Sequence, residues 1–303
     1  QMKLQDLKNF SEKKKNTLHF DYNIKNLNWF NIGGKSKLFY KPDSLKDLSE
    51  FLKLYNKRGK IFILGAGSNT LFTDEVYNGV VVKLGNRFNN ISKLNDNTVI
   101  AGSNVLDKNL SNYLAENEIG GLEFLSCIPG TVGGGVKMNS GCYGKEFKDF
   151  ILSIQVMDFE GNVYTIPSSK INFFYRGTDL KNDLIFLSAS FKGKKKKKEQ
   201  IYEEIERLKN KKKISQPSRV KTGGSTFKNP INSNKLKVWE LIKNSVPAGC
   251  EFGDATISHQ HFNFLVNKKD AKFNDMIKLI NFIKKKVFEK YKIKLNLEIV
   301  IAD

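Results

Sequence analysis

The chain has 303 residues, enough for two domains, and its 40% hydrophobic and 12% aromatic content is typical of a globular protein and excludes a disordered one. No run of about 18 apolar residues occurs, so the sequence predicts no membrane-spanning helix. Lys and Arg number 51 against 31 Asp and Glu, a net charge of +20. Because the excess is mostly lysine in a chain also rich in Asn, Ile and Phe, we attribute it mainly to overall composition, with binding of nucleic acid or of anionic ligands as the alternatives.

The first half of the chain predicts strands and helices in alternation. Ser44 and Asp47 form the S-x-x-D start of a helix over 44–55, whose apolar residues keep helical spacing. The apolar run that follows, 60–64, predicts a buried strand. The same reasoning predicts two more strands and a helix, at 79–84, 98–101 and 106–116.

The second half predicts a β-hairpin over 151–166 and a strand over 183–191. A run of lysines at 192–198 is the best candidate for a domain boundary. Beyond it, apolar stripes at helical spacing and one apolar closing segment predict three helices and a strand, at 200–213, 235–244, 273–290 and 295–302.

The cysteines and the first residues of the chain indicate in which cellular compartment the protein is expected. The three cysteines, Cys127, Cys142 and Cys250, are an odd number without a C-x-x-C pair, which disfavours a disulfide framework and a zinc ribbon. The lysine-rich start, 1–15, lacks the apolar core of a secretory signal. We therefore expect a reducing, cytoplasmic location.

Two glycine clusters are candidate sites for a phosphate-bearing ligand. The segment 65–69 (GAGSN) follows a predicted strand, where backbone N–H groups can face a phosphate. It departs from the Rossmann fingerprint, because no glycine stands at the third glycine position and no acid follows about 20 residues later. The second cluster, six glycines within 127–144, predicts loops or tight turns that admit a ligand close to the backbone. An ordinary turn and a surface loop are the alternatives.

Three further residues have the chemistry for a catalytic site. Arg176 follows an aromatic run and is a candidate clamp for an anion or an enolate, or else a surface arginine. Ser225 stands directly after two glycines as a candidate proton donor, or else a turn or N-cap serine; Phe227 rules out a G-x-S-x-G elbow. Glu298, in the closing apolar segment, is either a poised carboxylate or an outward-facing residue.

The two histidines of an H-x-H pair, His259 and His261, have no third ligand nearby. Strand alternation would put both on one face. We interpret them as structural residues and expect no metal site.

In their order and spacing, these motifs resemble those of the UDP-N-acetylenolpyruvoylglucosamine reductase family. The resemblance extends over about 27–303 and rests on six segments together, because each alone is weak. They are FNIGG from Phe30, LGAGSN from Leu64, IPGTVGG from Ile128 with Met138, Asn139 and Gly141, then Tyr175-Arg176, Gln216-Pro217 with GGSTFKNP from Gly223, and Ile257-Ser258 through His261 to Asn263-Phe264.

The resemblance implies an α+β fold. A two-part FAD-binding region of the vanillyl-alcohol-oxidase type, 1–192 with a split near 85, would precede an α/β substrate-binding domain, 200–303. It also implies FAD and NADPH as cofactors. The residues that would hold FAD are Gly65, Ala66, Gly67, Ser68, Asn69, Ile128, Pro129, Gly130, Thr131, Gly133, Gly134, Asn139 and Gly141.

The resemblance implies a reaction as well. Family members transfer a hydride from NADPH through FAD to UDP-N-acetylglucosamine enolpyruvate, and the product is UDP-N-acetylmuramate for peptidoglycan precursor synthesis. Ser225 matches the family's proton donor, and Arg176 and Glu298 match the residues that stabilise the enolate. The residues that would bind the substrate are Lys228, Asn229 and Tyr175.

Two features adjust this expectation. Relatives usually carry an arginine in the segment 250–254, where this chain has Glu251, so any substrate contact from that segment is left open. No insertion lies between 210 and 264, which is typical of the shorter family type without an extra substrate-closing loop. An FAD oxidase or dehydrogenase of the same fold is the alternative enzyme. We expect a monomer that has neither membrane nor nucleic acid as a partner.

Overall fold

The computed structural model describes residues 4–15 and 17–303, and the chain divides into two compact units. The first unit contains the described residues up to Asp21, then Lys37–Ala66 and Asn78–Lys211; the second contains Tyr22–Ser36, Gly67–Tyr77 and Lys212–Asp303. Each unit is therefore assembled from three separate stretches of chain. No helix in the described ranges combines the length and the apolar character needed to span a membrane.

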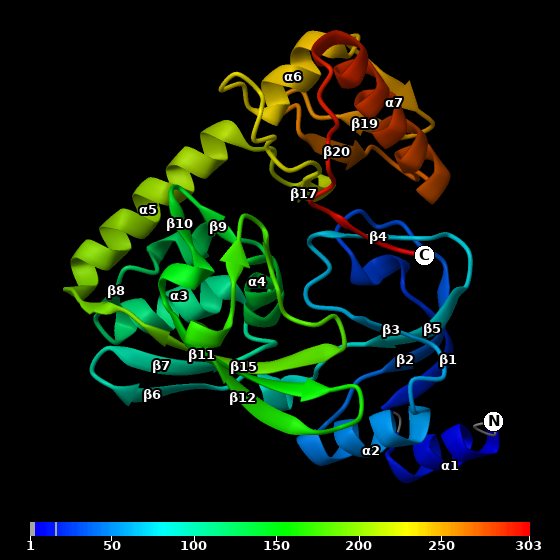
Figure 1. The fold of residues 1–303 in the computed structure, drawn as a ribbon, viewed down its shortest axis with the longest axis vertical. Helices are drawn as coiled ribbons and strands as arrows, with labels where there is room; N and C mark the ends of the chain where they lie inside the picture. Colours follow the sequence, from blue (N-terminus) through cyan, green and yellow to red (C-terminus); the bar gives the residue numbers. More distant parts are fainter. Residues whose placement is uncertain (1–3, 16) are drawn as a thin grey trace. The chain divides into compact units, whose positions relative to one another are not determined.

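Two sheets form the frame of the first unit (Figure 1). The smaller has the strand order β1-β2-β5-β3, and the larger, antiparallel throughout, has the order β12-β11-β15-β7-β6. Their strands are β1 (Leu18–Asn23), β2 (Lys35–Tyr40), β3 (Lys60–Ile63), β5 (Tyr77–Val82), β6 (Ile91–Asn95), β7 (Thr98–Gly102), β11 (Ile151–Asp158), β12 (Val163–Pro167) and β15 (Leu184–Lys192). The predicted strands at 60–64, 79–84, 98–101 and 183–191 and the predicted hairpin over 151–166 are confirmed.

Short strand pairs and helices complete this unit. The pairs are β8 (Ile119–Gly120) with β16 (Lys194–Lys195), β9 (Gly141–Cys142) with β10 (Lys145–Glu146), and β13 (Phe173–Phe174) with β14 (Gly177–Thr178). The α-helices are α1 (Leu4–Lys13), α2 (Leu45–Tyr55), α3 (Asp107–Glu116), α4 (Val132–Met138) and α5 (Lys198–Ser215). The 3-10 helices are η2 (Asn86–Phe88), η3 (Glu123–Cys127), η4 (Phe147–Asp149) and η5 (Ser168–Lys170).

Helix α2 begins where its sequence predicts. The Ser44 side chain accepts a hydrogen bond from the Asp47 N–H at 3.1 Å and so satisfies one of the free donors of the first turn. The apolar face of α2, with Leu48, Phe51 and Leu52, is buried against strands β2 and β5 and helix α1 (Figure 1). This packing fixes the small sheet whose strand ends lead into the first glycine cluster.

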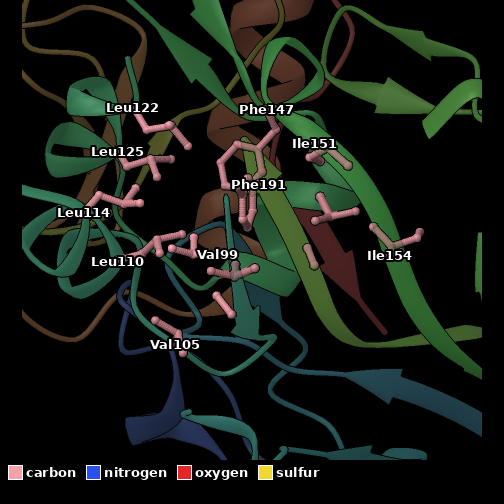
Figure 2. Packing of buried hydrophobic residues seen from close by; sticks show 14 of the residues in the cluster. Val99, Val105, Leu110, Leu114, Leu122, Leu125, Phe147, Ile151, Ile154 and Phe191 are labelled. Atoms are coloured by element: carbon pink, nitrogen blue, oxygen red, sulfur yellow. The ribbon is translucent and has the colours of Figure 1, made fainter. Parts of the chain in front are cut away.

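The core of the larger sheet holds the second glycine cluster in place. In Figure 2, Leu110 and Leu114 of α3 and Leu125 of η3 face Val99 and Phe191 of the sheet. Each such side chain contributes roughly 1.5–3 kcal/mol when fully buried. Because η3 leads directly toward α4, this packing anchors the segment that begins at Ile128.

The prediction of loops and turns throughout 127–144 is wrong in its middle, where α4 forms. Thr131 caps this helix and accepts a hydrogen bond from the Gly134 N–H at 3.4 Å. A Cβ on Gly135 would lie 2.2 Å from the ring of Phe147, so the glycine permits close packing there. Glycines lower helix propensity and carry no apolar pattern, which is why no sign of this helix appears in the sequence.

The lysine run at 192–198 belongs to the packed structure. Its strand β16 pairs with β8, and Lys196 Nζ lies 2.8 Å from Glu123 Oε1. The Glu123 side chain is only 2% exposed and also accepts a hydrogen bond from the Gly121 N–H. Helix α5, which begins in this run, lies in the first unit as far as Lys211, so the compact units divide the chain differently from the predicted 192–200 boundary. The predicted domains and the split near 85 stay a prediction.

Replacing Lys196 by methionine is expected to lower the free energy of unfolding by about 2–3 kcal/mol, because Glu123 would keep a buried charge without its cation. Lys195→Met, at an exposed position of the same run, should change it by less than about 0.5 kcal/mol. Urea unfolding followed by circular dichroism measures both. Equal stability of the two variants would contradict a structural role for the Lys196–Glu123 pair.

The second unit has a four-stranded sheet of order β17-β20-β19-β18 and a parallel pair, β4 with β21. The strands are β17 (Lys221–Ser225), β18 (Glu251–Phe252), β19 (Ala255–Ile257), β20 (Phe264–Asn267), β4 (Thr70–Phe72) and β21 (Val300–Ala302). The helices are η1 (Lys25–Leu27), α6 (Val238–Ser245) and α7 (Phe273–Tyr291). The predicted helices are confirmed, but the closing strand over 295–302 is shorter than predicted because its partner β4 offers only Thr70–Phe72 for pairing.

Candidate active site

The first glycine cluster lies at the end of β3 and presents backbone donors. The N–H groups of Gly65, Ala66 and Gly67 donate to no acceptor in the part of the chain that the structure describes. A Cβ on Gly65 would lie 2.7 Å from Thr131 Oγ1, so the segment 65–66 packs directly against the second glycine cluster. Consecutive uncommitted N–H groups of this kind can bind an anion.

The N–H groups at the start of α4 are used within the protein. Those of Val132 and Gly133 donate at 2.9 Å to the carbonyls of Val105 and Ser103, and that of Gly134 donates to the Thr131 side chain. The sequence predicts N–H donors for a phosphate in both glycine clusters. The geometry leaves such groups uncommitted in the first cluster, whereas those of residues 132–134 in the second already have acceptors within the protein.

Arg176 occupies the turn between β13 and β14. Its backbone is left-handed, with φ 56°, and its guanidinium lies 4.9 Å from the ring centre of Tyr175. Nη2 donates to the Gly141 carbonyl at 2.9 Å, and Nη1 lies 3.8 Å from Glu146 Oε1. With 18% of its side chain exposed, Arg176 is a positive charge held in one orientation by neighbours on both sides.

Asn139 connects α4 to the hairpin that carries Arg176. It is fully buried, adopts a left-handed conformation with φ 42° and ends α4. Its Nδ2 donates to the Phe174 carbonyl at 3.0 Å, and its Oδ1 accepts from the Lys148 N–H at 3.0 Å. The side chain of this expected FAD ligand thus has protein partners on both of its polar atoms.

Ser225 ends strand β17 in the second unit, where the backbone is tightly constrained. A Cβ on Gly223 would lie 2.3 Å from the ring of Phe30, so only glycine fits there. The next residue, Gly224, has space for a side chain, because a Cβ there would meet nothing within 4 Å. Glycine is favoured at this position by the backbone, which is left-handed with a φ of +75°. The strand register shifts between Thr222 and Ser225, which re-aims the serine relative to a regular strand.

Asn263 fixes the segment that follows Ser225, a role that the sequence reasoning did not assign. Its Oδ1 accepts from the Phe227 N–H at 3.0 Å, and its Nδ2 donates to the Phe227 carbonyl at 2.9 Å. Its carbonyl accepts from the Thr226 N–H. The only signal in the sequence is its place in the matched segment that ends in Asn263-Phe264.

Within the second unit, the backbone at Glu298 lies beside the segment that follows Ser225. Its N–H donates to the Thr226 carbonyl at 2.8 Å, and a β-bridge joins Phe227 to Leu297. The carbonyl of Glu298 accepts from Asn69 Nδ2 at 3.1 Å. The structure therefore brings together two predicted catalytic residues, Ser225 and Glu298, on neighbouring backbone segments, and it gives the side chain of Asn69 a structural partner.

The expected substrate residues have different settings. Lys228 is half-buried, whereas Asn229 is exposed and its Oδ1 accepts from the Val238 N–H at 3.0 Å at the start of α6. Glu251, at the position where relatives usually carry arginine, forms an ion pair of 2.7 Å with Lys268. The neighbouring lysine thus balances this acid.

The H-x-H segment forms a bend between β19 and β20 and belongs to no strand, so the prediction that both histidines share a strand face is wrong. His259 is exposed, whereas His261 accepts from the Asn263 N–H at 3.2 Å through Nδ1 and its ring lies 4.6 Å from that of Phe264. Burial lowers the pKa of His261. Among the described residues, no group of three or more His, Cys, Asp or Glu is placed to hold a metal ion.

The first unit fits FAD by its own chemistry. A dinucleotide needs backbone donors for its pyrophosphate and side-chain-free backbone for close approach, and the Gly65 cluster provides both beside Thr131. Within the first unit, the residues that would hold the pyrophosphate are Gly65 and Ala66. FAD would supply hydride-transfer chemistry, which amino-acid side chains do not provide.

Comparisons with known proteins match both parts of the chain. A family model described as "UDP-N-acetylenolpyruvoylglucosamine reductase, C-terminal domain" matches residues 216–302, and one described as "FAD binding domain" matches residues 36–167. The UDP-N-acetylenolpyruvoylglucosamine reductase of Pelagibacter ubique is 56% identical over 99% of both chains. That of Rickettsia typhi is 44% identical over 92% of this chain and 93% of its own. The crystal structure of the reductase from Thermus caldophilus superposes with a TM-score of 0.79 at 28% identity, covering 93% of this chain and 97% of that one.

Proposed function

The chain belongs to the UDP-N-acetylenolpyruvoylglucosamine reductase family, and on that premise we propose that it reduces UDP-N-acetylglucosamine enolpyruvate to UDP-N-acetylmuramate with FAD and NADPH. The observation that carries the proposal is the 56% identity to a named reductase over 99% of both chains. The match to an FAD-binding domain supports the cofactor. A cytoplasmic monomer that serves peptidoglycan precursor synthesis, and through it cell-wall growth and division, is part of the proposal.

FAD, when bound, would supply hydride-transfer chemistry, by which a hydride that originates from NADPH would reach C3 of the enolpyruvyl group. The hydride leaves negative charge on the substrate as an enolate, and the chain must stabilise that charge and deliver a proton to C2. We assign the proton to the hydroxyl of Ser225 and the charge stabilisation to the guanidinium of Arg176. Glu298 would support the serine or polarise the substrate carboxyl, and Lys228, Asn229 and Tyr175 would bind the UDP-sugar.

Rigidity supports these assignments. A serine is a weak acid, and it can protonate an enolate carbon only when the carbon is held within contact distance. The backbone around Ser225 is constrained by Gly223 against Phe30 and by Asn263. Arg176 is oriented by Gly141 and Glu146, and a preoriented charge stabilises a developing anion without reorganisation during the reaction.

The test of the proposed function is the colour of the protein. The purified protein is expected to be yellow, to lose its visible absorbance under NADPH without oxygen, and to regain it on addition of UDP-N-acetylglucosamine enolpyruvate. A preparation that stays colourless after incubation with FAD would refute the proposal.

The flavin is expected to be non-covalent. Heat denaturation followed by filtration should release all of the flavin as FAD into the filtrate. The cysteine of the second glycine cluster, Cys142, donates from its Sγ to the Phe124 carbonyl at 3.5 Å, so its thiol has a partner within the protein. Flavin that remains on the denatured chain would refute non-covalent binding alone and leave the reaction unaffected.

A further inference from the structure

Lys83 is a half-buried lysine that contacts the first glycine cluster. It directly follows β5, and its backbone N–H donates to the Tyr40 carbonyl at 2.9 Å. Its Nζ donates to the Gly65 carbonyl at 2.5 Å. The parallel register of β3 and β5, with Ile63 opposite Val82, is what places Lys83 beside the start of this cluster.

The charge of Lys83 is balanced by no carboxylate among the described residues. Burial, and after it repulsion by Lys41, lowers the pKa of Lys83. Removing an ammonium group from water without an acid partner costs free energy, and proteins normally pair such charges. A lysine in this position therefore indicates an anionic ligand nearby.

Lys83 can act on such a ligand through the trans peptide between Gly65 and Ala66. The carbonyl of Gly65 and the N–H of Ala66 belong to one planar peptide group and point in opposite directions. Because Lys83 holds the carbonyl, the Ala66 N–H is directed away from the lysine, and this N–H has no acceptor in the described chain. A charged donor on the carbonyl also polarises the peptide and strengthens its N–H as a donor.

We propose that Lys83 is a positioning residue for the FAD pyrophosphate: it fixes the Gly65–Ala66 peptide so that the Ala66 N–H faces the anion, and it adds a positive charge behind that peptide. The inference rests on the proposed use of FAD and adds a residue outside the glycine motifs. Lys83 itself touches the peptide and acts on the ligand through it.

The test is the affinity of the flavin-free protein for FAD, measured by flavin fluorescence, so no turnover is needed. Lys83→Met is expected to weaken FAD binding by about 10- to 100-fold, the usual effect of losing a hydrogen bond to a charged group. Lys83→Gln keeps a donor for the Gly65 carbonyl but no charge, and an intermediate loss is expected. Riboflavin, which has no pyrophosphate, should bind wild type and variants alike.

Lys41→Met is the matched control, because it removes the same charge from the end of the neighbouring strand β2 without touching Gly65. It should bind FAD at least as well as wild type, since it relieves repulsion on Lys83. A Lys83→Met affinity within about threefold of wild type would overturn the inference, as would an equal loss in Lys41→Met or for riboflavin. If Lys83→Met does not fold, the FAD affinity of Lys83→Gln is compared with those of wild type and Lys41→Met, and the same outcomes would overturn the inference. Failure of the wild type itself to bind FAD would instead refute the proposed function.

Discussion

Replacing Ser225 by alanine is expected to leave flavin reduction by NADPH near the wild-type rate and to slow reoxidation by UDP-N-acetylglucosamine enolpyruvate about 100- to 10,000-fold. The two half-reactions differ in their need for a proton: only the second leaves an enolate that must be protonated. The substitution removes the hydroxyl, while Gly223, Thr226 and Asn263 keep their backbone contacts.

Stopped-flow absorbance of the flavin measures each half-reaction separately. Ser218→Ala is the matched control, because Ser218 is an exposed serine of the same unit and should change neither rate. If Ser225→Ala slows reduction as much as reoxidation, Ser225 has a structural or binding role and its assignment as proton donor fails.

Arg176→Ala is expected to slow reoxidation by about 100- to 1,000-fold and again to spare reduction by NADPH. The charge of Arg176 matters only once negative charge develops on the substrate. Arg176→Lys should recover little of the loss. The planar guanidinium of arginine contacts the Gly141 carbonyl and Glu146 through two different nitrogens, and the single ammonium group of lysine cannot reproduce this arrangement.

The same stopped-flow experiment provides the measurement. Arg207→Ala is the control, because Arg207 pairs with Glu204 on the exposed face of α5 and should affect neither half-reaction. An equal loss in both half-reactions of Arg176→Ala would mean that the arginine maintains the β13–β14 hairpin or binds both substrates.

Local signals predicted the elements that are determined locally. Helix α2 has its cap, Ser44 with Asp47, and its apolar spacing within one stretch of sequence, and α7 has a continuous apolar stripe. Helix α4 could not be predicted from local sequence. Its glycines are required by close contacts with Ser103 and Phe147, and both of these residues lie outside the helix in sequence. The role of the lysine run escaped prediction for the same reason, since Glu123, the partner of Lys196, lies 73 residues away.

In the candidate site too, some residues could be predicted from local sequence and others could not. The glycine clusters, Arg176 and Ser225 stand in the segments that carry the family resemblance, and Glu298 stands in the predicted closing strand, so they could be named from sequence. The residues that orient them could not. Asn263 and Glu146 act through backbone groups and contacts that only the folded chain brings together, and Lys83 looks like any other lysine in a chain with a large lysine excess.

The parallel pair of β4 with β21 has a consequence for the order of folding. Val300 pairs with Thr70, so a strand near the start of the chain is synthesised long before its partner. Contacts of such wide sequence separation incur their loop-closure entropy before they contribute stability, and they form slowly. Strand β4 therefore stays without its native partner until the last residues of the chain have been synthesised, and during that time its edge is open to non-native pairing.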